Sequence, residues 1–283
     1  MEGKLYVVAT PIGNLDDITL RAINTLKEVD IIIAEDTRHS LKLLNHLNIS
    51  KPLISYHRHN EEIKKDMIIN KIKEGNNIAL ISDAGTPVVS DPGEVIVKEA
   101  LKENIQVIPI PGACALITAL MGAGVSTKKF LFLGFLSLNK KLRKKELEKI
   151  EKEESTVILY EAPHKIKNTL NDLEKYVGKR NIVVARELTK IHEEFIKGTI
   201  EEVINQIENP KGEYIIIIDE NEEIEDEENE LNNLSLEEHY KYYENQGMNK
   251  KEIIKQIAKD RNVSKNDIYM KFIWKYRSYD FIS

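Results

Sequence analysis

Residues 79–93 read ALISDAGTPVVSDPG, and this stretch decides the fold. The aliphatic residues at its start are typical of a buried strand, whereas Gly, Pro, Ser and Asp crowd the turn that follows, before a helical pattern begins near Glu94. An ordinary strand-to-helix connection fits this pattern, but so many small residues favour close approach of a ligand to the main chain. We therefore predict that residues 82–93 form the floor of a binding cleft.

Two further turns rich in small residues follow predicted strands, at residues 9–19 and 110–115. In an open parallel sheet, the loops that leave the carboxyl ends of the strands lie along one edge. Three such turns therefore converge on one crevice, and we expect a small molecule to bind there.

The order of the predicted elements indicates an α/β protein. Between residues 1 and 122, strands alternate with helical patterns, which predicts a parallel sheet with helices on both faces. Residues 123–220 repeat the alternation, but two strands near 182–186 and 194–198 are joined by a short loop, so part of this second sheet is expected to be antiparallel. We predict an N-terminal α/β domain at 1–122 and a second α/β domain at 123–220.

The last part of the chain has a different character. Residues 221–233 are rich in acidic residues and Asn without an apolar period, which is typical of a solvated linker. Residues 234–283 show three helical patterns, and the turn at 261–263, with Ser264 placed to cap the next helix, resembles a helix-turn-helix. A three-helix cap fits the same pattern.

Composition limits the class of protein. The chain has 283 residues, 41% of them hydrophobic, which is enough for a core in each of two domains. The single cysteine, Cys114, leaves no partner for an internal disulfide, and Leu5 already begins a strand, so we expect an intracellular, cytoplasmic protein. The net charge of −6 argues against a uniformly basic nucleic-acid binder, but basic residues gather at Lys140–Lys145 and at 250–277. The seven histidines lack metal-ligand spacing, so no metal is predicted.

Six stretches, in one order along the chain, resemble a known family. They are residues 5–18, 35–39, 82–93, 109–115, 159–165 and 185–194, and they include TPIGNL at 10–15, EDTR at 35–38 and YEAPHK at 160–165. Together they resemble the bacterial small-subunit ribosomal RNA cytidine 2′-O-ribose methyltransferases of the tetrapyrrole methylase superfamily. The match covers about residues 1–220, and the helical tail is consistent with it. One departure is Lys165, where the family usually has Arg.

The resemblance implies two α/β domains of the tetrapyrrole methylase type, a parallel-sheet domain and a mixed-sheet domain, followed by the small helical domain. It also implies a homodimer, S-adenosyl-L-methionine bound between the two α/β domains, and small-subunit ribosomal RNA, free or assembled, as the partner. The absence of Gly-x-Gly-x-x-Gly after the first strand agrees with a fold other than the Rossmann type. The positions that match the cofactor pocket are Ala84, Gly85, Thr86, Val89, Cys114, Ala115, Glu161, Ala162 and Ala185.

Methyl transfer to a ribose hydroxyl needs in-line positioning, and it is helped by a base that accepts the hydroxyl proton or by a cation that stabilises the negative charge developing on the oxygen. The catalytic candidates are Glu187 as the base, with Arg186 and Arg38 as cations near the reacting oxygen or an RNA phosphate. The resemblance assigns RNA contact to Thr10, Gly13, Asn14, Arg38, Lys165 and Lys190, and the two basic clusters would add phosphate contacts.

Two other functions fit parts of the sequence. A tetrapyrrole C-methylase would use the same scaffold and cofactor, although the basic clusters and the TPIGN turn favour RNA. A non-catalytic regulator would bind nucleic acid through the helix-turn-helix, although the acidic balance and the cleft loops argue against it.

Overall fold

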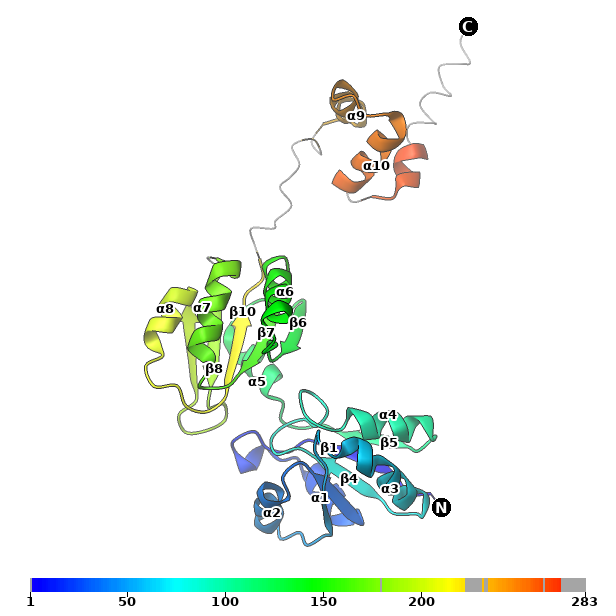
Figure 1. Cartoon of the computed structure of the whole chain (residues 1–283), viewed down its shortest axis with the longest axis vertical. Helices are drawn as coiled ribbons and strands as arrows, with labels where there is room; N and C mark the ends of the chain where they lie inside the picture. Colours follow the sequence, from blue (N-terminus) through cyan, green and yellow to red (C-terminus); the bar gives the residue numbers. More distant parts are fainter. Residues whose placement is uncertain (1, 179, 222–230, 232–233, 262, 271–283) are drawn as a thin grey trace. The chain divides into compact units, whose positions relative to one another are not determined.

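Two five-stranded sheets organise most of the chain. The computed structural model describes residues 2–178, 180–221, 231, 234–261 and 263–270. It divides into two units, Met1–Glu220, which contains both sheets, and Asn221–Ser283, which contains the last helices (Figure 1). Within the described residues, no helix has both the length and the apolar character needed to cross a lipid bilayer.

The first sheet is entirely parallel, with the order β3-β2-β4-β1-β5. Every residue of β2 and β4 is buried, because helices cover both faces of these central strands. The predicted parallel sheet is therefore confirmed. The strands are β1 (Leu5–Val8), β2 (Ile31–Ala34), β3 (Leu53–Ser55), β4 (Ile78–Ile81) and β5 (Val107–Ile110).

Four helices form the two layers around this sheet. Leu26 of α1 and Leu44 of α2 pack in the core on one face, while Ile72 of α3 and Ile96 of α4 pack in the core on the other. The predicted cap of α1 is confirmed, since the Thr19 hydroxyl accepts a hydrogen bond from the Ala22 amide at 3.1 Å. The helices are α1 (Leu20–Glu28), α2 (Thr37–His46), α3 (Glu61–Lys73) and α4 (Glu94–Lys102), with a short 3₁₀ helix, η1, at Leu15–Asp17.

The second sheet is mixed, as predicted, with the order β6-β7-β10-β8-β9. Only β6 and β7 run parallel, and the other neighbours are antiparallel. Three helices, α6, α7 and α8, supply apolar residues to the core on one face. The elements are β6 (Phe130–Gly134), α6 (Lys140–Glu151), β7 (Thr156–Glu161), α7 (Ile166–Val177), β8 (Ile182–Arg186), β9 (Glu194–Gly198), α8 (Ile200–Gln206) and β10 (Tyr214–Ile218).

Helix α5 (Ala115–Ala123) covers the other face of the second sheet, although it follows directly from the first sheet in sequence. Its residues Leu116, Ala119 and Leu120 share a core with strand residues such as Ile158 and Ile217. The boundary predicted between residues 122 and 123 thus falls at the end of a helix that serves the second sheet.

Helix α8 was not predicted, although a local signal marks it. Thr199 and Glu202 form a capping box, in which each side chain accepts a hydrogen bond from the other residue's amide. Ile200 and Val203 then bury one face of this short helix.

The second unit contains helices α9 (Leu236–Asn245) and α10 (Lys250–Asp260), and residues 265–270 are also helical. The predicted cap at Ser264 is confirmed, since its hydroxyl accepts a hydrogen bond from the Asp267 amide at 3.2 Å. The buried imidazole of His239 joins the helices through Asp260 and Arg261, at 3.2 Å from each. Most of the predicted linker at 221–233, the turn residue Asn262 and the last helix beyond residue 270 lie outside the described residues.

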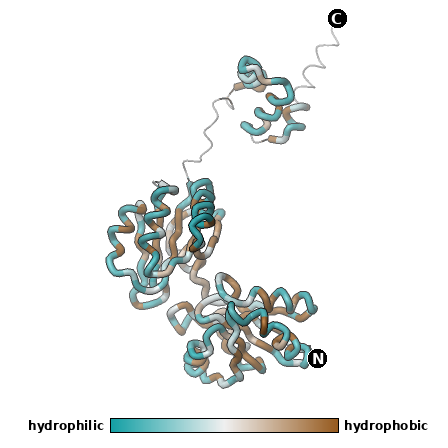
Figure 2. Tube along the Cα trace, in the orientation of Figure 1, coloured by the Kyte–Doolittle hydropathy of each residue, from teal (hydrophilic) through white to brown (hydrophobic). Residues whose placement is uncertain are grey.

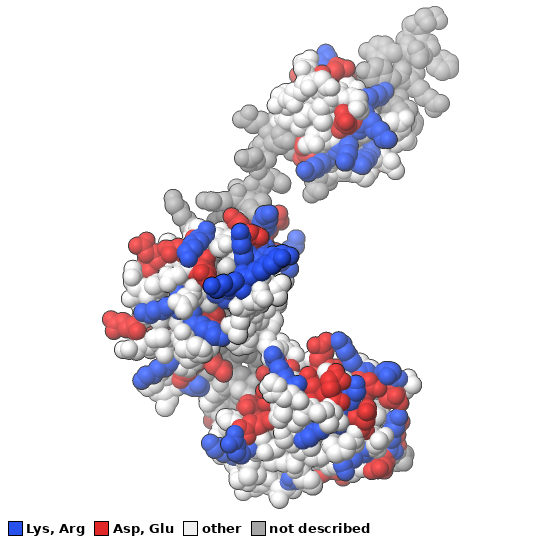
Figure 3. Space-filling view, viewed as in Figure 1, with Lys and Arg blue, Asp and Glu red and all other residues white. Residues whose placement is uncertain are grey.

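Hydropathy and charge are distributed as this layering requires. Most strands of the first unit are hydrophobic, whereas the helices around them, apart from the apolar α5, are more polar (Figure 2). Lys and Arg side chains gather over α6 on the face shown in Figure 3. The exposed lysines of this helix include Lys140, Lys141 and Lys145.

Candidate active site

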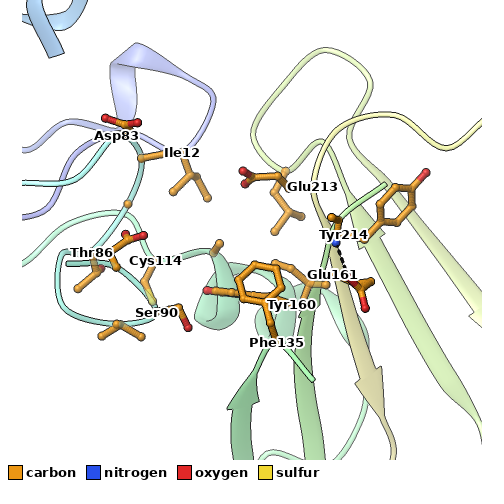
Figure 4. A pocket seen from close by; sticks show the side chains of 18 of the residues that line it. Ile12, Asp83, Thr86, Ser90, Cys114, Phe135, Tyr160, Glu161, Glu213 and Tyr214 are labelled. Carbon is orange, nitrogen blue, oxygen red and sulfur yellow. Dashed lines mark hydrogen bonds between the residues drawn. The ribbon is translucent and has the colours of Figure 1, made fainter. Parts of the chain in front are cut away.

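A cavity of about 400 Å³ lies within the first unit and is lined by residues that follow strands of both sheets. Ile12 and Asp83 come from the first half, and Glu213 and Tyr160 come from the second (Figure 4). The turns predicted to converge, after β1, β4 and β5, all contribute to it.

The loop after β4 is held by main-chain contacts. Gly85 forms an isolated antiparallel bridge with Thr10, in which the Thr10 amide donates to the Gly85 carbonyl at 2.8 Å and the Gly85 amide donates to the Thr10 carbonyl at 3.1 Å. The Thr86 hydroxyl donates to the Ala113 carbonyl at 3.0 Å and so links this loop to the turn after β5. Gly85 has a φ of +81°, which favours glycine.

The same loop contains backbone strain. Val88 and Ser90 have φ values of 76° and 67°, although a β-branched residue such as valine rarely adopts this region. Arg58 supports the loop, because its guanidinium donates a hydrogen bond to the Ser90 carbonyl. Strain of this kind persists where the surrounding structure fixes it, and it is common at binding sites.

Three carboxyl groups, those of Glu35, Asp83 and Asp91, line the first-sheet side of the cavity. Burial, reinforced by the nearby carboxylate of Glu35, raises the pKa of Asp91 to about 6. Burial, followed by the charge of Asp83, also raises the pKa of Glu35. Asp91 is therefore able to exchange a proton near neutral pH.

On the second-sheet side, Tyr160 and Glu161 end β7. The Tyr160 hydroxyl accepts a hydrogen bond from the Leu116 amide at 3.1 Å, and burial raises the pKa of Tyr160. Glu161 is buried, and its two carboxylate oxygens accept hydrogen bonds from the Thr169 hydroxyl at 2.6 Å and from the Ala162 amide at 2.8 Å. Glu161 therefore orders the end of β7.

The loop after β8 closes the cavity against the turn after β1. Glu187 and Lys190 both line the cavity and form an ion pair at 3.0 Å. The Thr189 hydroxyl accepts a hydrogen bond from the Asn14 amide at 3.0 Å. A Cβ atom added to Gly13 would lie 2.8 Å from the Thr189 hydroxyl and 2.7 Å from a Lys190 side-chain carbon, so only glycine permits this approach.

Most residues predicted for cofactor binding lie together at this cavity. The eight that line it are Ala84, Gly85, Thr86, Val89, Cys114, Ala115, Glu161 and Ala162. The ninth, Ala185, is fully buried in β8 and packs in the core beneath the site.

The three predicted catalytic residues do not lie together in the structure. Glu187 lines the cavity, but Arg186 and Arg38 do not. Arg186 is paired with Glu194 at 2.5 Å and lies 3.4 Å from the Tyr214 hydroxyl, and both contacts raise its pKa. Arg38 is paired with Asp36 at 2.7 Å, while 90% of its side chain is exposed.

The residues predicted to contact RNA also differ in placement. Lys190 lines the cavity, and Asn14 is exposed beside it, where its side chain accepts a hydrogen bond from the Asp16 amide at 3.1 Å. Thr10 is only 1% exposed and its hydroxyl faces the Ser82 and Gly85 carbonyls, so it serves the turn. Lys165 is half-buried at the start of α7, away from the cavity lining.

The individual residues predicted for the site omit about half of the cavity lining, although Asp83, Ser90 and Asp91 belong to the stretch 82–93 that was predicted as the floor of the cleft. Asp83 and Asp91 were inside the quoted stretch, and Glu35 directly follows a predicted strand, so the position of polar residues at strand ends was an available signal. Phe135 and Glu213 had no such signal, because their role depends on how the second sheet meets the first. The missed residues are Ile12, Glu35, Asp83, Ser90, Asp91, Phe135, Tyr160, Pro163, Leu188, Glu213, Tyr214 and Ile215.

Comparison with known proteins assigns this architecture. A family model described as Tetrapyrrole (Corrin/Porphyrin) Methylases matches residues 4–204. The chain belongs to the tetrapyrrole methylase family. This family membership confirms the predicted fold type and makes the chain a methyltransferase.

Curated relatives of this methylase match nearly its whole length. The chain is 49% identical over 271 residues to "Ribosomal RNA small subunit methyltransferase I" of Halalkalibacterium halodurans, with 95% of this chain and 94% of the relative covered. It is equally similar, at 49% over 271 residues, to the protein of the same name from Bacillus subtilis, with 94% and 93% covered.

Solved structures share the methylase fold at low sequence identity. A diphthine synthase structure has a TM-score of 0.60 and 14% identity, and covers 77% of this chain and 90% of its own. Uroporphyrin-III C-methyltransferase from Thermus thermophilus, complexed with S-adenosyl homocysteine, has a TM-score of 0.56 and 16% identity, and covers 77% and 97%. At such identities, the likeness establishes the fold.

Proposed function

We propose that this methyltransferase transfers a methyl group from S-adenosyl-L-methionine to the ribose 2′-hydroxyl of a cytidine in small-subunit ribosomal RNA. The observation that carries the proposal is the nearly full-length similarity to relatives whose names state small-subunit ribosomal RNA methylation. The cytidine and the 2′-oxygen come from the motif resemblance. The homodimer, the cytoplasmic location and the choice between free RNA and an assembled subunit are further parts of the proposal.

The cavity fits the proposed cofactor. Its volume of about 400 Å³ is within the range of small-molecule sites. Gly85 offers main chain without a side chain at the wall, and a Cβ atom there would lie 3.0 Å from the Ile12 side chain. Ala84, Gly85 and Thr86 would hold the cofactor on one side, and Ala162, near the end of β7, would bound it on the other.

The catalytic demand on the chain is positioning. When bound, the cofactor supplies an electrophilic methyl group whose bond to sulfur breaks as its bond to the ribose oxygen forms. The Thr10–Gly85 bridge and the Thr86 hydrogen bond fix the loop 82–93, and this loop would in turn hold the cofactor in place. The hydrogen bond from the Asn14 amide to the Thr189 hydroxyl joins the turn after β1 to the loop after β8 at the edge of the cavity.

A carboxylate must accept the proton of the 2′-hydroxyl, and Glu187 is the proposed acceptor. It lines the cavity from the loop that also carries Lys190, whose ammonium group forms an ion pair with the Glu187 carboxylate at 3.0 Å. Its own φ of 51° is unusual for a glutamate and fixes the direction of the side chain. Asp91, with its raised pKa, is the second carboxylate able to take this proton.

The test is a methylation assay on two substrates. Purified protein is incubated with methyl-labelled S-adenosylmethionine and either small ribosomal subunits from a deletion strain or uroporphyrinogen. We expect label only in the ribosomal RNA, and mass spectrometry of its nucleosides should identify 2′-O-methylcytidine. Label confined to the tetrapyrrole would instead establish the C-methylase alternative, and label in neither, with no cofactor binding by calorimetry, would favour the non-catalytic regulator.

A further inference from the structure

Phe135 is an aromatic side chain at the mouth of the cavity that the proposed chemistry does not yet use. Its side chain lines the cavity and yet is 56% exposed. Figure 4 shows it at the second-sheet side, next to Tyr160. What distinguishes Phe135 from other exposed apolar residues is its place in the cavity lining, where a flat ring can stack on it.

A local irregularity in β6 directs Phe135 toward the cavity. Opposite β7, Phe132 pairs with Ile158 and Gly134 pairs with Leu159, so β6 contains one extra residue. In a regular strand, Phe135 would lie on the face opposite Phe132. The bulge and the φ of 66° at Gly134 bring it to the same side.

Aromatic neighbours fix the Phe135 ring. It meets the Tyr160 ring edge to face, with centroids 5.7 Å apart, and Tyr160 in turn meets Phe132 at 4.9 Å. Tyr160 is itself anchored through the Leu116 amide. Phe135 is therefore a preorganised surface with one side open.

Positive charge follows Phe135 closely in the chain. Helix α6 begins five residues later, at the cavity end of β6, and carries Lys140, Lys141, Lys144 and Lys145. No carboxylate within 4 Å of Lys140, Lys141 or Lys145 is found among the described residues. Lysines four residues apart repel each other, and a cation at the N-terminal end of a helix is unfavourable, so Lys140 and Lys141 do not stabilise the start of α6.

We propose that Phe135 and the first lysines of α6 form an RNA-binding surface beside the opening of the cavity. A base of the single-stranded substrate stacks on Phe135, and Lys140 and Lys141 bind the phosphates beside it. This inference rests on the proposed function and adds the residues that select a nucleic-acid strand. Stacking on an aromatic together with a basic track is how single strands are bound without sequence readout.

The test measures RNA binding and methylation separately in the full-length chain. For Phe135→Leu, we expect the dissociation constant for a fluorescent oligocytidylate and the KM for small ribosomal subunits to rise about tenfold, while cofactor affinity by calorimetry is unchanged. Phe135→Tyr should behave as wild type. Leu138→Ala is the matched control, because Leu138 is 77% exposed in the same loop and does not line the cavity.

The lysines are tested through salt dependence. The Lys140→Ala/Lys141→Ala variant should reduce the slope of log affinity against log salt by about one to two units. Lys98→Ala/Lys102→Ala on α4 should not, because these lysines already pair with Glu94 and Glu99.

Several results would overturn the inference. The first is RNA binding that is unchanged in Phe135→Leu, and the second is no RNA binding by the wild type. The third is a loss of cofactor affinity as large as the loss of RNA affinity, which would mean that Phe135 contacts the cofactor. RNA binding that depends on Phe135, without methylation of ribosomal RNA, would leave the inference standing and refute the proposed function.

Discussion

The two walls of the cavity are built in different ways. The first-sheet wall combines main chain and small side chains of the loop 82–93, where Gly85 is bridged to Thr10 and Thr86 is hydrogen-bonded to Ala113, with the carboxyl groups of Glu35, Asp83 and Asp91. The second-sheet wall presents large aromatic and charged side chains, among them Tyr160, Glu187 and Glu213. Contacts from the main chain do not depend on side-chain identity and suit a cofactor shared by related enzymes. Contacts from side chains change with each substitution and suit a substrate that differs between relatives. We therefore expect the first wall to supply most cofactor contacts, and the second wall, apart from Glu161 and Ala162, to contact the methyl acceptor.

The largest effect should come from filling the main-chain wall. Gly85→Val places a branched side chain at a φ of +81°, next to Ile12, and we expect calorimetry to detect no cofactor binding. Gly178→Val is the matched control, because Gly178 also has a positive φ of 64° but has nothing within 4 Å of an added Cβ. Equal loss of binding in both variants would mean that global strain, and not the cavity, explains the result.

The side-chain wall should affect turnover more than cofactor binding. Glu187→Gln removes the proposed proton acceptor with little change of shape, and we expect kcat to fall by about 10²-fold at constant cofactor affinity. Asp91→Asn is the paired variant and should retain most of the activity. The reverse pattern, with a lost acidic limb near pH 6 in the Asp91→Asn rate profile, would move the base to the first-sheet wall.

The ionised carboxylate of Asp91 should also lower the free energy of unfolding of the protein. Its pKa of about 6 in the folded state exceeds the ordinary 3.8, so between these values the folded state binds more protons than the unfolded state. Stability therefore falls as pH rises through this window. Because the side chain is partly exposed, we expect Asp91→Asn to raise the free energy of unfolding by about 1–2 kcal/mol at pH 8.

Denaturant unfolding at pH 8 and pH 4 checks this, and the gain should shrink at pH 4. A gain in the free energy of unfolding that is the same at both pH values would show that burial does not raise the pKa of Asp91.

The smallest effect concerns the contact between the two walls. Thr189→Val removes the hydroxyl that accepts a hydrogen bond from the Asn14 amide. Because both groups reach solvent, we expect the free energy of unfolding to fall by about 1 kcal/mol or less. Cofactor affinity should weaken a few-fold by calorimetry. Thr156→Val is the control, because the Thr156 hydroxyl donates to the Ser126 carbonyl at 2.7 Å and neither residue lines the cavity. A loss of cofactor binding as large as that of Gly85→Val would show that the closing contact, not the main-chain wall, is decisive.

The sequence predicted the first-sheet wall better than the second. The loop 82–93 is contiguous, and its glycines and prolines have a direct conformational meaning, so the local pattern predicted the floor of a cleft, and the family resemblance then singled out Ala84, Gly85 and Thr86. Arg186 and Arg38 looked equally suitable by position after a strand. The ion pair of Arg186 with Glu194 depends on the register between β8 and β9, whereas that of Arg38 with Asp36 joins residues two apart and was open to prediction from the sequence.

The sequence by itself determined the strand and helix order, the parallel and mixed sheets and the family, because these follow from local apolar periodicity and from motifs at fixed positions. Only the tertiary structure decided that α5 serves the second sheet, that the bulge at Gly134 brings Phe135 to the cavity and that Gly13 lies against Thr189. These features depend on contacts between residues far apart in the chain, whose geometry is set by packing and not by the character of any single segment.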